Sequence, residues 1–207
     1  MKVSTKLNSL ALAAALLMPF AANAESNFQT GAGTPLTATA HVDFTIIVPK
    51  ILYLRVGTGT AGATNGAIDL ITFTVPAASV GNGTPIAGTG GDLTGGVVTA
   101  IVQGNNGTVT LNATSGGALT NATADTINYT QIVTTPTALA GFGALLNPPV
   151  LVNGASANIT INPATSKVVS SGPQWTYSYL NTNVVAPGTY GGAGVNNGRV
   201  TYTASMP

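Results

Sequence analysis

Apolar and polar residues alternate along an unusually long stretch near the start of the chain. From residue 36 to residue 48 the apolar side chains share one parity, and the polar ones share the other apart from Ile47. Successive side chains of an extended chain point to opposite faces, so this pattern predicts a β-strand with one apolar face. At about 3.3 Å per residue it would run roughly 40 Å, well beyond a usual strand. Its apolar members are Leu36, Ala38, Ala40, Val42, Phe44, Ile46 and Val48.

Pro49 ends this stretch. Proline cannot donate to a β-ladder, so we expect the strand to stop or bend there. The apolar side chains in its first half are mostly small, whereas those in its second half are large. We therefore assign residues 42–48 to the protein's own core. Leu36, Ala38 and Ala40 are then the part that a neighbouring chain could bind as a donor strand.

Shorter alternating runs, separated by Gly, Asn and Pro turn signals, fill the rest of the chain. Asn-Gly pairs tolerate positive φ and predict hairpins at residues 97–113 and 150–161. Residues 138–146 are apolar without alternation, and Gly141 and Gly143 limit any helix there to a single turn. About nine strands and no substantial helix predict an all-β fold, an antiparallel β-sandwich. The other expected strands are residues 51–56, 68–75, 127–133, 167–170, 175–180 and 200–206.

The first 24 residues have the layout of a secretory signal peptide. A basic start with Lys2 and Lys6 precedes a short apolar run, and Ala22-Asn23-Ala24 forms a small-x-small cleavage site. No later apolar run is long enough to span a bilayer, so we expect no membrane span after cleavage. The expected organisation is a signal peptide over residues 1–24, an N-terminal extension over 25–41 and a β-sandwich domain over 42–207.

The charge and the cysteine content limit the classes of function and the sources of stability that we expect. Removal of the two signal-peptide lysines changes the formal net charge from +1 to −1, because four basic residues then face five acidic ones. So few cations cannot neutralise a run of phosphates, and we therefore expect no nucleic-acid binding. The chain contains no cysteine. An exported protein without disulfides must draw its stability from its sheets and core.

The sequence contains no strong pattern of catalytic or metal-binding residues. His41, the one histidine, shares a strand face with Asp43, but a metal or acid–base site would need more ligands than this pair supplies. Paired carboxylates for glycoside hydrolysis would need two of the four aspartates to converge. We read these groups as exposed or turn-forming residues and expect no enzymatic activity, no metal and no cofactor. The aspartates are Asp43, Asp69, Asp92 and Asp125.

Trp175, Tyr177 and Tyr179 alternate with polar residues and place three aromatic side chains on one strand face. Such a stripe could be a stacking platform for sugars. Because Thr176 and Ser178 occupy the opposite parity, we assign the aromatic residues to the core.

The closing segment carries a family resemblance. Ala186-Pro187-Gly188-Thr189-Tyr190, followed by a strand that ends in Arg199-Val200-Thr201-Tyr202, is similar to the last two strands of bacterial fimbrial subunits of the chaperone-usher type. It is closest to those with a spore coat protein U-like domain. The resemblance implies an Ig-like sandwich that lacks its own last strand. A neighbouring subunit's N-terminal segment would fill the gap, helped by a periplasmic chaperone and an outer-membrane usher.

Two functions follow as hypotheses. The first is a secreted, non-enzymatic structural subunit of a surface fibre, a fimbria or pilus, which polymerises with itself by β-strand addition. The alternative is a self-contained β-sandwich module for adhesion or carbohydrate binding, which would need an exposed aromatic platform.

Overall fold

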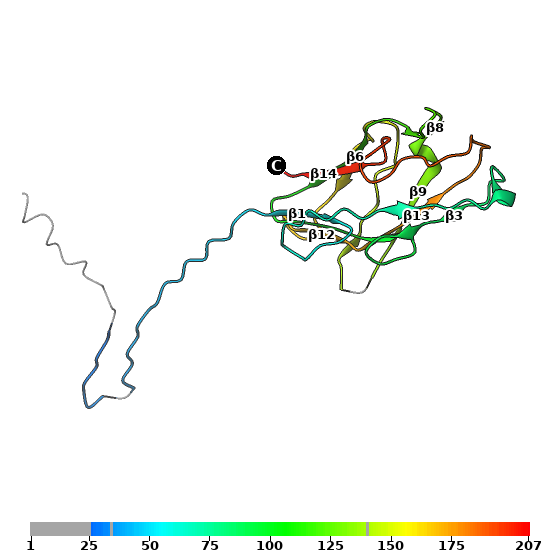
Figure 1. Ribbon diagram of the computed structural model, residues 1–207. Coiled ribbons are helices and arrows are strands. Elements are labelled where there is room, and N and C mark those ends of the chain that lie inside the picture. Colours follow the sequence, from blue (N-terminus) through cyan, green and yellow to red (C-terminus); the bar gives the residue numbers. More distant parts are fainter. Residues whose placement is uncertain (1–25, 34, 140) are drawn as a thin grey trace, which may run out of the picture. The chain divides into compact units, whose positions relative to one another are not determined.

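The computed structural model describes residues 26–33, 35–139 and 141–207 (Figure 1). The expected signal peptide lies outside these residues. The chain divides into two units, one that ends at Val48 and one that comprises Pro49–Pro207. The second unit contains all the strands described below.

The larger sheet is built around β5 (Val97–Gly104). β1 (Leu52–Val56) pairs antiparallel with β5 on one side, and β12 (Val169–Gly172) and β13 (Gln174–Tyr179) pair antiparallel with it on the other. β9 (Ile132–Thr137) then pairs with the whole of β13. Two short strands complete the larger sheet. β3 (Ile86–Ala87) pairs antiparallel with β13, and β10 (Ala144–Leu145) pairs parallel with β12.

The smaller sheet has β6 (Val109–Ser115) at its centre. β11 (Ile159–Ile161) and β14 (Val200–Ser205) flank it, both antiparallel (Figure 1). Two-residue strands form two further pairs, β2 (Ile71–Thr72) with β4 (Thr89–Gly90) and β7 (Leu119–Thr120) with β8 (Thr126–Ile127). The helical elements among the described residues are two 3-10 turns, η1 (Ala77–Ser79) and η2 (Tyr129–Gln131). The predicted all-β, mainly antiparallel class is confirmed.

The core lies between β5 and β13 of the larger sheet and β6 of the smaller one. Trp175 is fully buried and donates its indole N–H to the Leu146 carbonyl oxygen at 2.7 Å. Its ring centroid lies 5.2 Å from that of Tyr202 on β14, and the Tyr202 and Tyr177 hydroxyls share a 2.9 Å hydrogen bond. Tyr202 of the smaller sheet therefore contacts two aromatic residues of the larger one. Tyr177 and Tyr179 are buried as well.

The prediction that residues 97–113 form a hairpin is wrong. β5 and β6 follow each other in the chain but belong to different sheets. Both runs bury their alternate side chains completely, so each faces the common core from its own side. Asn105, in the connection, accepts from the Ile51 backbone N–H at 2.8 Å and donates to the Pro49 carbonyl oxygen at 2.7 Å. The connection thus anchors the start of β1 instead of closing a two-stranded ladder.

The second predicted hairpin, at residues 150–161, is also wrong. β11 pairs with β6, and residues 150–154 form no strand. The Asn153 side chain accepts from the Tyr129 backbone N–H at 3.0 Å and donates to Asn128 at 2.7 Å. The Asn-Gly turn therefore serves as an anchor for η2. The strands expected at residues 68–75 and 127–133 are reduced to β2 and to β8 with the start of β9.

The N-terminal unit corrects a third expectation. Its described residues, 26–33 and 35–48, form no helix or strand and are all exposed. Phe44 is 86% exposed and Ile46 85% exposed, so residues 42–48 are not part of the protein's own core. The alternation of residues 42–48 gives this segment an apolar face, but a β-strand also needs a neighbouring strand for its backbone hydrogen bonds. The edge of β5 is not available to the segment, because β1 pairs there.

The burial of Trp175 gives a direct stability test. Trp175→Ala removes the largest fully buried side chain and leaves the Leu146 carbonyl without its donor, so we expect a loss of about 3–5 kcal/mol in the free energy of unfolding. Urea denaturation measures it. Trp175→Phe keeps most of the volume and serves as the milder control. Equal, small losses for both variants would contradict the packing of this core.

Candidate functional site

A pocket of about 450 Å³ lies between β1 and β14 in the Pro49–Pro207 unit and is called here the β1–β14 pocket. Buried core residues form its floor. β1 forms one wall and the start of β14 forms the other, while the loop that follows β1 lies along the rim. The floor residues are Val98, Tyr129, Leu151 and Tyr177, with half-buried Ile132.

Both walls of the pocket are edge strands. Within the described residues, β1 pairs with β5 alone and β14 with β6 alone, so the opposite edge of each strand has backbone N–H and C=O groups without a ladder partner. Their inward-facing side chains are only partly buried although they pack against the core. Unpaired strand edges of this kind offer backbone groups with which a further strand can pair. The partly buried residues are Leu54 and Val56 on the β1 side and Val200, Tyr202, Ala204 and Met206 on the β14 side.

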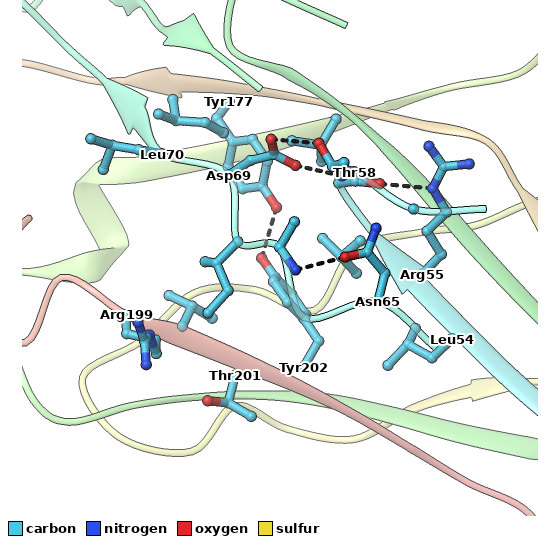
Figure 2. A pocket seen from close by; sticks show the side chains of 18 of the residues that line it. Leu54, Arg55, Thr58, Asn65, Asp69, Leu70, Tyr177, Arg199, Thr201 and Tyr202 are labelled. Carbon is cyan, nitrogen blue, oxygen red and sulfur yellow. Dashed lines mark hydrogen bonds between the residues drawn. The ribbon is translucent and has the colours of Figure 1, made fainter. Parts of the chain in front are cut away.

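A glycine-rich loop, residues 57–70, borders the pocket on its solvent side. The Asp69 carboxylate accepts two hydrogen bonds from Thr58, one from the backbone N–H at 2.5 Å and one from Oγ1 at 2.8 Å. Figure 2 shows this contact on one side of the pocket, and on the other side Thr201 of β14 and Arg199, which directly precedes that strand. The carboxylate thus joins the two ends of the loop.

The base of the loop is fixed to the larger sheet. Arg55 on β1 donates from Nε to the Gly57 carbonyl oxygen at 2.7 Å and forms a 2.9 Å ion pair with Asp92. Asp92 also accepts from the Thr99 backbone N–H and from Thr99 Oγ1, each at 2.7 Å. Gly57 donates its own N–H to the Thr99 carbonyl at 2.7 Å. The start of the loop is therefore held firmly.

The polar groups at the floor of the pocket are tyrosine hydroxyls that already have partners. Tyr177 and Tyr202 bond to each other, and Tyr129 donates to the Asn197 carbonyl oxygen at 2.5 Å. Burial raises the pKa of Tyr202 and of Tyr129 to about 12, and burial is also the main cause that raises the pKa of Tyr177 well above 10. These hydroxyls remain protonated near neutral pH and are poor general bases, so the pocket floor is suited to apolar contact.

No protein-family model, curated protein or solved structure matches the chain. Its function must therefore follow from its own geometry.

The residues considered for catalysis do not form one site. His41 and Asp43 are exposed in the N-terminal unit, while Asp92 is engaged by Arg55 and Thr99. Hydrogen bonds from Thr123 and Asn121 lower the pKa of Asp125. Among the described residues there is no group of three or more His, Asp or Glu side chains that could hold a metal. None of the helices in that part of the chain could reach across a bilayer.

The proposed donor residues Leu36, Ala38 and Ala40 are exposed in the N-terminal unit. The larger apolar side chains of residues 42–48, which were expected in the core, are exposed beside them. The sequence did not predict that a pocket would lie between residues 51–56 and 200–206. Only the resemblance to fimbrial subunits implied an unfilled gap in the fold, without assigning it to any pair of strands.

The Trp175–Tyr177–Tyr179 stripe cannot be a sugar platform, because all three side chains lie in the core. The alternative function of a carbohydrate-binding module loses the feature that it required.

The tyrosine hydroxyls predict how stability depends on pH. A tyrosine whose folded pKa lies above its unfolded value of 10 stabilises the fold below that pH, and this stability is lost as the pH rises through the folded pKa. We expect the free energy of unfolding to fall between about pH 10 and 12, with each such tyrosine contributing about 1.4 kcal/mol per pH unit. Denaturation over this range, with phenolate absorbance recorded alongside, measures it.

The matched variant is Tyr202→Phe. It should lower stability at neutral pH, because the Tyr177 hydroxyl loses its partner, and should flatten the alkaline fall. A free energy of unfolding that is constant through the window would contradict the role given to these hydroxyls.

Proposed function

We propose that the chain is a secreted, non-enzymatic structural subunit of a surface fibre, in which the N-terminal segment of one copy occupies the β1–β14 pocket of the next. The observation that supports this most directly is that a pocket between two unpaired strand edges occurs in a chain that also has an exposed, alternating apolar segment. Strand addition requires both features.

The donor segment in this proposal is longer than the sequence suggested. Leu36, Ala38 and Ala40 remain part of it, and the large side chains of Val42, Phe44 and Ile46 continue the same parity. Each large apolar side chain gains about 1.5–3 kcal/mol when it moves from water into a buried site. Main-chain hydrogen bonds to a free edge would add affinity, and alternate side chains would fill the pocket.

The start of the domain favours exchange between copies. To return beside β1, the segment would have to reverse direction within residues 49–51. Asn105 holds the backbone there through the Pro49 carbonyl and the Ile51 N–H. A segment given to another copy leaves both bonds intact. Because the donor segment and the pocket are different surfaces, the contact is head-to-tail and can extend without closing.

The partners in this proposal are other copies of the chain, together with a periplasmic chaperone and an outer-membrane usher that would protect the pocket before assembly. The expected signal peptide would direct the chain through the periplasm to the cell surface. No nucleic acid and no cofactor has a role.

The test is a parity-matched pair of variants in the mature chain. Phe44→Asp/Ile46→Asp places charges on the apolar parity of the donor segment, and we expect it to abolish assembly because a buried, unpaired carboxylate is costly. Thr39→Asp/Thr45→Asp adds the same charge on the opposite parity and should still assemble. Size-exclusion chromatography with light scattering, followed by electron microscopy, measures the outcome.

Two results would contradict the proposal. One is a wild-type chain that remains monomeric at high concentration and does not bind a peptide of residues 36–48. The other is equal assembly of the two double variants, since strand addition depends on parity.

A further inference from the structure

The 57–70 loop borders the same pocket that a donor strand would have to enter. Its residues Ala63, Asn65 and Ala67 line the β1–β14 pocket together with core residues such as Val98 and Tyr177. Figure 2 shows Asn65 and Tyr177 among them. A strand added along β1 or β14 would therefore compete with this loop for space. Resting on the proposed function, we infer that the loop is a movable cover, and that the contact between Asp69 and Thr58 controls how fast a donor strand can enter.

The loop covers the pocket without filling it. Ile68 is 68% exposed and Leu70 is 52% exposed, so its own large apolar side chains do not take the place of a donor. It forms no strand between residues 57 and 70. A segment that is exposed and outside any ladder can open at low cost compared with the sheets that it borders.

The contact between Asp69 and Thr58 is suited to hold such a cover closed. It joins residues eleven positions apart, at the two ends of the loop, and one partner is a carboxylate. Hydrogen bonds to charged groups are stronger than neutral ones. Two of the remaining bonds at the tip are local, from the Ala63 N–H to the Thr60 carbonyl and from the Ala67 N–H to Asn65 Oδ1, and they can persist while the loop moves. The third joins the loop to β1, from the Tyr53 hydroxyl to the Thr60 carbonyl oxygen at 3.0 Å, and this neutral bond must break when the loop opens.

Gly57 makes the contact possible. Its φ is +89°, which favours glycine, and a Cβ added there would lie 2.1 Å from the Asp69 carboxylate. Arg55 and Thr99 hold the same residue on the larger sheet. The fixed point therefore lies at Gly57, and the loop can open beyond it when Asp69 releases Thr58.

The experiment measures the association rate of a fluorescent peptide of residues 36–48 with the full mature chain. The chain has Phe44→Asp/Ile46→Asp, so that its own donor segment cannot compete. We expect Asp69→Ala to raise the rate about tenfold, equivalent to about 1.4 kcal/mol, and Thr58→Val about threefold. Thr60→Val is the matched control in the same loop, where the backbone carbonyl and not the side chain accepts from Tyr53 at 3.0 Å.

A disulfide tests the same cover in the opposite direction. The chain has no cysteine of its own, and a Cβ at Gly57 would lie 3.6 Å from the Asp69 Cβ, within the range of disulfides. Oxidised Gly57→Cys/Asp69→Cys should bind the peptide at least tenfold more slowly than the same protein after reduction. This comparison uses one protein in two states, so a general loss of stability cannot produce the result.

The outcomes separate the two proposals. If the peptide binds no variant, the proposed function is wrong and the cover has no role. If it binds at one rate to the parent chain, to Asp69→Ala and to both redox states of the disulfide variant, strand addition stands and the cover is disproved. Faster entry for Asp69→Ala together with slower entry for the oxidised variant supports the cover.

Discussion

The contact of Tyr202 with Trp175 and Tyr177 holds the two sheets together on the side where the domain is open. Tyr202 lies on β14, opposite Ala113 of β6, and its ring reaches across to the larger sheet. Because the chain has no cysteine, the sheets are joined by packing and hydrogen bonds alone. This aromatic contact therefore closes the core beneath the pocket that lies between β1 and the start of β14.

The domain consequently leaves part of its core half covered. Leu54 and Val56 on one wall and Val200 on the other pack on the core but are not fully buried. Folded domains are stable by only about 5–15 kcal/mol, so incomplete burial along a whole strand is significant. The exposed side chains of Phe44 and Ile46 pose the same problem in the N-terminal unit. In the proposed fibre, one contact between copies would bury both the half-covered core of one copy and the exposed apolar side chains of the next copy's N-terminal segment.

Hydrogen bonds from asparagine side chains fix several loops of this domain, a role that disulfides and ion pairs have in many other proteins. Asn181 is 1% exposed, adopts a positive φ of 52°, accepts from the Gly81 N–H and donates to the Ser79 carbonyl. Asn105 binds the backbone that leads into β1, and Asn153 binds the start of η2. An amide can donate and accept at once, so one side chain can satisfy two backbone groups. This explains how a chain with so few charges can order long loops.

The sequence by itself determined the all-β class. It also determined the strands at residues 51–56, 175–180 and 200–206 and the buried aromatic face of the second of these. These features follow from the alternation of apolar and polar residues, which is a local property and shows which face of a strand is apolar. Tertiary structure decided which strands pair. β5 and β6 have the alternation and the turn residues of a hairpin, yet they lie in opposite sheets, since burying both inner faces against one core outweighs local pairing. It also decided that residues 42–48 are exposed. Periodicity shows that these residues have an apolar face, but the partner that would cover it depends on ladder positions set by distant segments.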